Sequence, residues 1–377
     1  MRVGVGVYSG GPSGLPVSVL ETATALHTAG LDVTLFATSD APQAPALADR
    51  TVRLAALPRA LRDARVEQAL QLVQRRALGR RLARALDDAP VDVLHLFSPG
   101  IASARSHRVP TVVQSWFHPP TLSGRLRTML PLAPRNALWP VRAGAEVQAF
   151  AADRLGFRHA DLVLANTLEA ERALAAQGLR VERIPPCIAV GAEPPARERS
   201  DTLRLAFCAH NLHSPRKGLA DLLAALPLVS GGPLKLTLVG GWHDSLAAPV
   251  EAVRRAGVEV EAVGRVPRER YLQVLAERTD LLVMASRYEE WGYALLEALS
   301  LGVPALAYDR YPFSEIVDAR SGILAAPGGP RELARGIESA LAGALPAATA
   351  VQASARERYG AAVTAQRLSA AYAGCTR

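Results

Sequence analysis

Two glutamates eight positions apart have the residue type and the spacing to bind hydroxyl groups. Glu289 follows the apolar run 281–284, which predicts a buried strand, and Glu297 lies one turn into the helix predicted next. Helical side chains point back towards the helix N-terminus, so we expect both carboxylates at the carboxyl edge of a parallel sheet. There they can accept hydrogen bonds from the hydroxyls of a sugar or a ribose, while free helix amides suit a phosphate.

The stretch 286–304 around these glutamates supports a binding site more strongly than either acid does alone. Gly292 allows a tight backbone where the helix begins, and Tyr293 is expected to be the first residue of that helix. A purely structural interpretation of each glutamate stays open, because acids in the first turn of a helix are favoured by its dipole.

A basic pair, Arg216 and Lys217, stands immediately before Gly218, between a predicted strand and a predicted helix. Lys217 is one of only two lysines among the 43 Lys and Arg residues, which argues against a chance placement. Fixed cations at a helix N-terminus would stabilise the negative charge that develops on a departing pyrophosphate. The alternative is an ordinary basic turn.

Glycines follow two further predicted strands and would let backbone groups approach a nucleotide. They are Gly240, in Gly240-Gly241, and Gly264, which precedes Arg265 and Val266. Each signal is weak alone, because a glycine after a strand most often marks only a turn. No Asp-x-Asp pattern occurs in the chain, so no carboxylate pair of that kind is available to hold a divalent cation on a diphosphate.

Apolar runs alternate with helical patterns along the chain, and this rhythm predicts an α/β fold with two doubly wound parallel sheets. The polar segment 191–202 interrupts the rhythm and predicts an interdomain linker. We therefore expect one Rossmann-like domain at 1–190, a second at 203–355, and a helical tail at 356–377 that crosses back to the first domain. Strands are expected at 3–8, 33–36, 91–97, 111–115, 162–165, 181–184, 205–209, 234–239, 258–263, 281–284 and 303–307.

These motifs together resemble the retaining GT-B glycosyltransferases of family 4, the glycosyl transferases group 1. Glu289 and Glu297 match the Glu-x7-Glu signature of that family, and 302–304 matches the Gly-x-Pro that follows it. The resemblance covers most of the chain and is stronger in the second half. It implies a GT-B architecture, in which two Rossmann-like domains face a central cleft, with the acceptor bound by the first domain and the donor by the second.

The resemblance also implies roles for residues of the second domain. Glu289 would contact the transferred sugar, Glu297 would bind the nucleotide ribose, and Lys217 would clamp the phosphates. The family has an Arg five or six residues before that Lys, where this chain has Asn211 and Leu212. This departure weakens the usual clamp, unless Arg216 substitutes for the missing contact.

In the first domain, the resemblance places Gly11 in a glycine loop whose amides face the diphosphate, and His118 where a histidine contacts the donor sugar. A structural role stays open for His118 and is the favoured one for His95. The expected donor-binding residues are Gly11, Arg216, Lys217, Gly240, Arg265, Val266, Glu289, Gly292, Tyr293 and Glu297. The expected catalytic residues are His118, Arg216, Lys217 and Glu289.

Composition narrows the possible partners. The formal net charge is +8, but no basic stripe is interleaved with aromatic residues, so nucleic acid is not expected as a partner. The three cysteines lack metal-ligand spacing and suit a reducing compartment. Neither a signal peptide nor a run long enough to span a membrane is evident, which favours a cytoplasmic protein. Peripheral contact with the inner face of a membrane stays open for the Arg-rich segment 59–84 and for 117–157.

We therefore expect a hexosyltransferase that moves a sugar from a nucleoside diphosphate sugar, UDP-sugar favoured, to a hydroxyl acceptor. Retention is implied only by the resemblance. No metal ion or cofactor besides the donor is expected, and the acceptor could be an envelope glycan, a lipid-linked saccharide or a natural product. Two alternatives stay open: a GT-B nucleotide-sugar epimerase or pseudo-glycosyltransferase, and a catalytically inactive nucleotide-sugar-binding protein.

Overall fold

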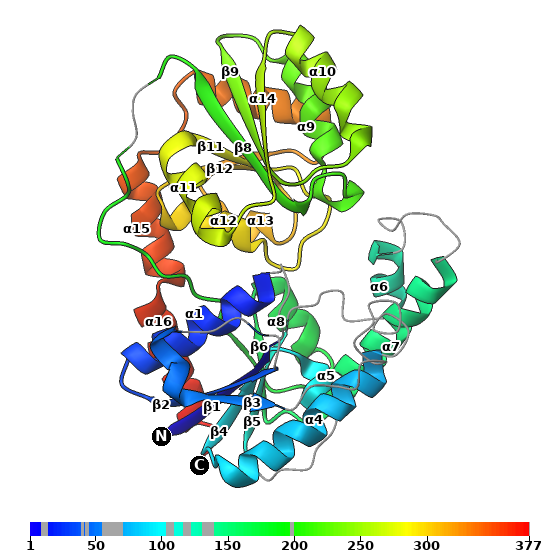
Figure 1. The fold of residues 1–377 in the computed structure, drawn as a ribbon, viewed down its shortest axis with the longest axis vertical. Coiled ribbons are helices and arrows are strands. Elements are labelled where there is room, and N and C mark those ends of the chain that lie inside the picture. The colour runs from blue at the N-terminus through cyan, green and yellow to red at the C-terminus, as the bar shows by residue number, and fades with distance from the viewer. Residues whose placement is uncertain are drawn as a thin grey trace. The chain divides into compact units, whose positions relative to one another are not determined.

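A computed structural model of the chain contains two compact units, each built around its own parallel sheet (Figure 1). The first unit comprises residues 1–187 and 361–377, and the second comprises residues 188–360. The sequence prediction placed the corresponding limits at 190, 202 and 355. The structure describes residues 1–8, 14–38, 41, 45–54, 71–102, 109–115, 122–129, 139–196 and 200–376.

The first unit contains a seven-stranded sheet in the order β3-β2-β1-β4-β5-β6-β7, with all neighbouring strands parallel. Its inner strands are apolar on both faces, as expected where helices cover both sides of a sheet. The strands are β1 (Arg2–Tyr8), β2 (Asp32–Thr38), β3 (Thr51–Leu54), β4 (Val93–Leu96), β5 (Thr111–Ser115), β6 (Leu162–Ala165) and β7 (Val181–Arg183).

Helices cover both faces of this sheet. One face packs on α1 (Gly14–Thr28) and α16 (Ala361–Ala373), which lie side by side although they come from opposite ends of the chain (Figure 1). The other face packs on α4 (Gln71–Asp88), α5 (Pro99–Ala102), α7 (Trp139–Arg158) and α8 (Leu168–Ala175). A short helix, α6 (Leu122–Met129), contacts α7, and the 3-10 turn η1 (Pro45–Arg50) precedes β3.

The second unit contains a six-stranded parallel sheet in the order β10-β9-β8-β11-β12-β13. Its strands are β8 (Leu203–Asn211), β9 (Leu234–Gly241), β10 (Glu259–Gly264), β11 (Leu281–Met284), β12 (Ala305–Tyr308) and β13 (Gly322–Ala325). In both units the strand order reverses at the middle of the sheet, between β1 and β4 and between β8 and β11. This arrangement confirms the predicted pair of doubly wound α/β domains.

One face of the second sheet packs on α9 (Leu219–Ala225), α10 (Ala247–Arg255) and α14 (Pro330–Leu341), whose leucines and valines form its core. The remaining helices are α11 (Arg268–Arg278), α12 (Tyr293–Ser300), α13 (Phe313–Ile316) and α15 (Ala348–Tyr359). No helix in the described part of the chain is both long and apolar enough to cross a membrane.

The prediction that the helical tail begins at residue 356 is wrong. Helix α15 begins at Ala348. The segment before 356 is rich in alanine, which has the highest intrinsic helix propensity of the amino acids. This helix packs on α12, and Gln352 Nε2 donates to the Ser300 carbonyl at 3.1 Å. A break at Gly360 separates it from α16, whose Tyr372 hydroxyl lies 2.7 Å from His95 Nδ1 in the first sheet.

Candidate functional site

The candidate site lies where the strand order of the second sheet reverses, between β8 and β11. At such a point the two following loops diverge, which opens a crevice at the carboxyl ends of the strands. Here the two loops touch through their backbones, because Arg287 N–H donates to the Arg216 carbonyl at 2.8 Å. Gly218 allows this approach, since its φ is +74° and a Cβ atom would lie 1.9 Å from the Ala285 carbonyl oxygen.

The loops bring three predicted residues, Arg216, Lys217 and Glu289, into one charge cluster. Lys217 Nζ donates to Glu289 Oε1, and Arg216 Nη1 lies 3.4 Å from Glu289 Oε2. The Glu289 side chain is only 7% exposed. A carboxylate removed from water in this way depends on its cations, because removal of one partner leaves an uncompensated buried charge.

Ser286 completes the surroundings of Glu289, and the sequence analysis missed it. Its buried hydroxyl donates to Glu289 Oε1 at 3.0 Å. Ser286 is an uncharged donor to this carboxylate and lies in the same loop as Glu289. The signal in the sequence is its place three residues before Glu289, just after β11.

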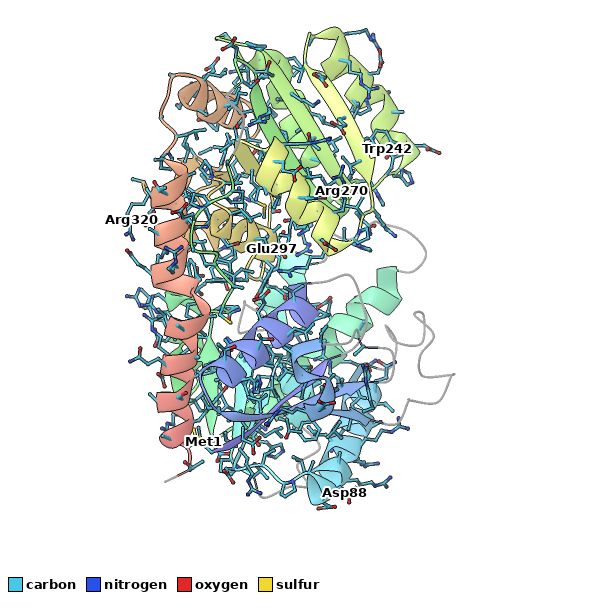
Figure 2. The ribbon with its side chains drawn as sticks, turned by 60° about the vertical axis from the view of Figure 1, so that its left-hand side comes forward. Met1, Asp88, Trp242, Arg270, Glu297 and Arg320 are labelled. Carbon is cyan, nitrogen blue, oxygen red and sulfur yellow. The ribbon has the colours of Figure 1, made fainter. Side chains whose placement is uncertain are left out.

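Glu297, on α12, is held by a different partner. Arg268, the first residue of α11, donates from Nε to Glu297 Oε1 at 2.8 Å. The Glu297 side chain, labelled in Figure 2, is 8% exposed. Burial raises the pKa of the nearby Tyr271 hydroxyl and Cys208 thiol above their ordinary values, and the negative charge of Glu297 adds to both shifts. The two buried glutamates are therefore ionic sites with separate cations, and sequence reasoning did not find Arg268.

Backbone geometry at the start of α12 agrees with the role predicted for Gly292. Its φ of +88° places it in the left-handed region, where it serves as the N-cap residue of the helix. Tyr293 is the first residue of α12 and is buried. Gly240 has a φ of +145° at the end of β9, and its backbone packs against Ala209.

Arg265 lies at the edge of the same unit, just after β10, with Val266 half-buried beside it. Its Nη2 donates to Asn211 Oδ1 at 2.6 Å, so it reaches across β9 to the end of β8. Burial lowers the pKa of His210, and the positive charge of Arg265 lowers it further.

Two predicted site residues, Gly11 and His118, lie outside the described residues. His95 is part of β4, and its ring is fully buried and stacked on Phe97. Burial lowers the pKa of His95 to about 3, so the ring is neutral at neutral pH. The structure thus gives His95 a place in the core.

Two further features bear on the chemistry. Within the described ranges, no group of three or more His, Cys, Asp or Glu side chains could hold a metal ion. A cavity of about 550 Å³ lies between α9, α10 and the loop 212–215, but neither the charge cluster nor Glu297 lines it.

Two family models match the chain. Residues 194–358 match the model described as glycosyl transferases group 1, and residues 13–187 match the glycosyl transferase 4-like domain. The chain belongs to the group 1 glycosyltransferases. No curated protein sequence matches it significantly.

Solved structures share the fold of this glycosyltransferase over its whole length. A lipopolysaccharide outer core galactosyltransferase, WaaB, is 15% identical with a TM-score of 0.68, and the match covers 99% of each chain. HepE from Anabaena, solved with UDP, is 19% identical with a TM-score of 0.67, covering 99% of this chain and 100% of HepE. Sucrose-phosphate synthase from Thermosynechococcus elongatus is 17% identical with a TM-score of 0.69, covering 99% and 98%. These neighbours are GT-B proteins, so the predicted GT-B fold is confirmed.

Proposed function

We propose that this glycosyltransferase moves a sugar from a UDP-sugar to a hydroxyl acceptor, with retention of the anomeric configuration and without a metal ion. The observation that carries the proposal is the charge cluster of Arg216, Lys217 and Glu289 where the strand order reverses. It offers cations for a diphosphate and a carboxylate for sugar hydroxyls within one loop pair. The choice of UDP draws support from HepE, which has been solved with UDP and with UDP-glucose.

In this reaction the bond between the anomeric carbon and the diphosphate oxygen breaks, and the electron pair leaves with the diphosphate. The acceptor oxygen forms the new bond on the same face of the sugar, and its proton passes to the departing phosphate. Lys217 and Arg216 stabilise the charge that develops on the leaving group. Glu289 accepts hydrogen bonds from hydroxyls of the transferred sugar and holds it in a reactive orientation.

The contacts within the cluster give this proposal a specific first step. Lys217 donates to Glu289, so a diphosphate that binds Lys217 competes with this carboxylate for the ammonium group. Glu289 then exchanges a cation for sugar hydroxyls, and the Ser286 hydroxyl remains as its protein partner. Elsewhere, Glu297 is proposed to bind the ribose, with Arg268 fixing its carboxylate, and the roles that the resemblance implies for His118 and Gly11 stay predictions.

Nucleotide binding tests this proposal most directly. We expect UDP to raise the unfolding temperature more than dTDP, GDP or ADP, with no change on adding a chelator. Saturation at 100 times the dissociation constant stabilises a protein by about 2.7 kcal/mol, which shifts the transition measurably. A shift that disappears with chelator would overturn metal independence, and no shift with any nucleotide would overturn the donor site.

A second measurement separates transfer from the competing activities. With a UDP-sugar bound, release of free UDP should accelerate when a hydroxyl acceptor is added. An epimerase would convert the donor without releasing nucleotide, and an inactive binding protein would do neither.

A further inference from the structure

The charge cluster does not hold enough free positive charge for a diphosphate. Both of its cations contact the Glu289 carboxylate, so the three groups together carry one net positive charge. A departing nucleoside diphosphate carries more negative charge than one cation balances. A further cation near the same loop is therefore needed if the proposed function holds, and the following inference rests on it.

Arg265 lies near this loop, and its positive charge is not paired with a carboxylate of the described residues. Its anchor, Asn211, is a neutral amide, and no carboxylate of the described residues forms an ion pair with its guanidinium group. The group lies directly on the backbone of Gly241, where a Cβ atom would be 2.6 Å from Arg265 Nε and 2.8 Å from Nη2. The glycine at 241 leaves room for the guanidinium group here, and the exposed Arg265 keeps further N–H donors besides the one that bonds Asn211.

A short run of backbone hydrogen bonds connects Arg265 to the charge cluster. The Asn211 carbonyl accepts from Ser214 N–H at 3.2 Å, and the Ser214 carbonyl accepts from Lys217 N–H at 2.9 Å. Leu212 N–H donates to the Gly241 carbonyl at 3.1 Å. This bond connects the start of the loop to β9, whose last residue, Gly241, lies against Arg265. Asn211, whose side chain bonds Arg265, and Lys217 therefore stand at opposite ends of one hydrogen-bonded segment at the end of β8.

We propose that Arg265 binds the diphosphate of the donor and that Asn211 is the residue that positions it. The guanidinium group of Arg265 supplies a phosphate contact from β10, at the end of β8 where the chain itself carries the uncharged Asn211. Asn211 is a positioning residue, because it acts on the phosphate only through Arg265.

Affinities for UDP and for uridine, which lacks phosphate, test this assignment. In Arg265→Gln we expect UDP to bind about 10-fold more weakly or worse, since a charge-assisted hydrogen bond is lost, while uridine binds as in the unaltered protein. Asn211→Ala should weaken UDP about 3-fold with the same indifference to uridine. The measurements are titration calorimetry for UDP and saturation-transfer NMR for uridine.

A matched control is Arg270→Gln, which removes another arginine that bonds a neutral amide, that of Gln273, in the same unit (Figure 2). It should leave UDP affinity unchanged, and an equal loss there would overturn the assignment. Equal weakening of UDP and uridine in Arg265→Gln would assign Arg265 to the base instead of the phosphate and would also overturn it. Unaltered protein that fails to bind UDP would mark failure of the proposed function itself. Unfolding temperatures of the variants, in the absence of nucleotide, confirm that each one is folded.

Discussion

In the residues that the structure describes, the two sheets share one topology and carry different kinds of polar groups near the carboxyl ends of their strands. In the second unit, β8 and β11 lead into ionic contacts between Arg216, Lys217 and Glu289. In the first unit, β4 and β5 carry His95 and Gln114, which are neutral and buried.

Neutral buried groups of the first unit form hydrogen bonds with one another. Gln114 Nε2 donates to Asn166 Oδ1 at 2.6 Å and to the Ile184 carbonyl at 3.2 Å, and His95 bonds Tyr372 of α16. Buried polar groups that pair internally fix the packing of elements, whereas a buried carboxylate paired with partly exposed cations can exchange its partners for a ligand. The same fold thus uses polar residues for docking a helix in one unit and, under the proposed function, for chemistry in the other.

The largest expected effect comes from Glu289→Gln. Turnover should fall about 100- to 1,000-fold, because the variant loses the charge that faces the reacting sugar, while UDP binding persists. The measurement is acceptor-dependent release of UDP at saturating donor. Glu259→Gln is the matched control, since Glu259 also pairs with a lysine, Lys235 at 2.6 Å, but is 65% exposed. Unchanged turnover in Glu289→Gln would contradict the chemical role proposed for the charge cluster of the second unit.

The pH dependence of the free energy of unfolding tests the other side of the comparison, the neutral buried groups of the first unit. Burial holds the pKa of folded His95 near 3, below the 6.5 of an unperturbed ring. The unfolded chain therefore binds a proton that the folded chain excludes, and stability is lost as pH falls below 6.5. Between pH 6 and 4.5 this one group should contribute a loss of about 1.4 kcal/mol per pH unit.

The variant His95→Gln should reduce that slope in urea unfolding curves, whereas His243→Gln, on the surface of the second unit, should leave it unchanged. If the slope is the same with and without His95, the buried ring is not what makes the first unit sensitive to acid.

Tyr372→Phe tests whether the buried polar pair of Tyr372 and His95 docks α16 on the first sheet. Removing the hydroxyl leaves His95 Nδ1 buried without this partner, so the free energy of unfolding should fall by about 1–3 kcal/mol. UDP affinity should stay unchanged, because the pair fastens α16 and does not reach the second sheet. Thermal melts and UDP titration of the same sample check both halves, and a selective loss of UDP binding with unaltered stability would contradict the docking role.

The smallest effect is expected for Ser286→Ala. Loss of one hydrogen bond to Glu289 should lower kcat about 3- to 10-fold and leave the KM for donor almost unchanged, since Ser286 only orients the carboxylate. Ser286→Thr should recover part of the loss by restoring the hydroxyl. An increase in KM with unaltered kcat would show that Ser286 contributes to binding instead of positioning.

Much of the fold could be read from local patterns. The strands predicted at 111–115, 162–165 and 281–284 agree with β5, β6 and β11 to the residue, because each is a short apolar run between clear breaks. The prediction missed β3 and β13, each of which is four residues long and lies at the edge of its sheet. It also misjudged the start of α15, where an Ala-rich stretch shows no amphipathic period although it packs against α12.

The sequence by itself determined the residue types of the site. Glu289, Arg216 and Lys217 lie in segments that follow predicted strands, Glu297 lies in the first turns of the next helix, and parallel strands end at one edge. Only the tertiary structure decided which polar and charged side chains form pairs. Glu289 takes its cations from the loop after β8, Glu297 takes Arg268 from α11, and Arg265 crosses to Asn211. Such partners lie 29 to 73 positions apart in the chain, so no local pattern encodes them. Strand order and helix packing bring them together, and these depend on the burial of the whole core.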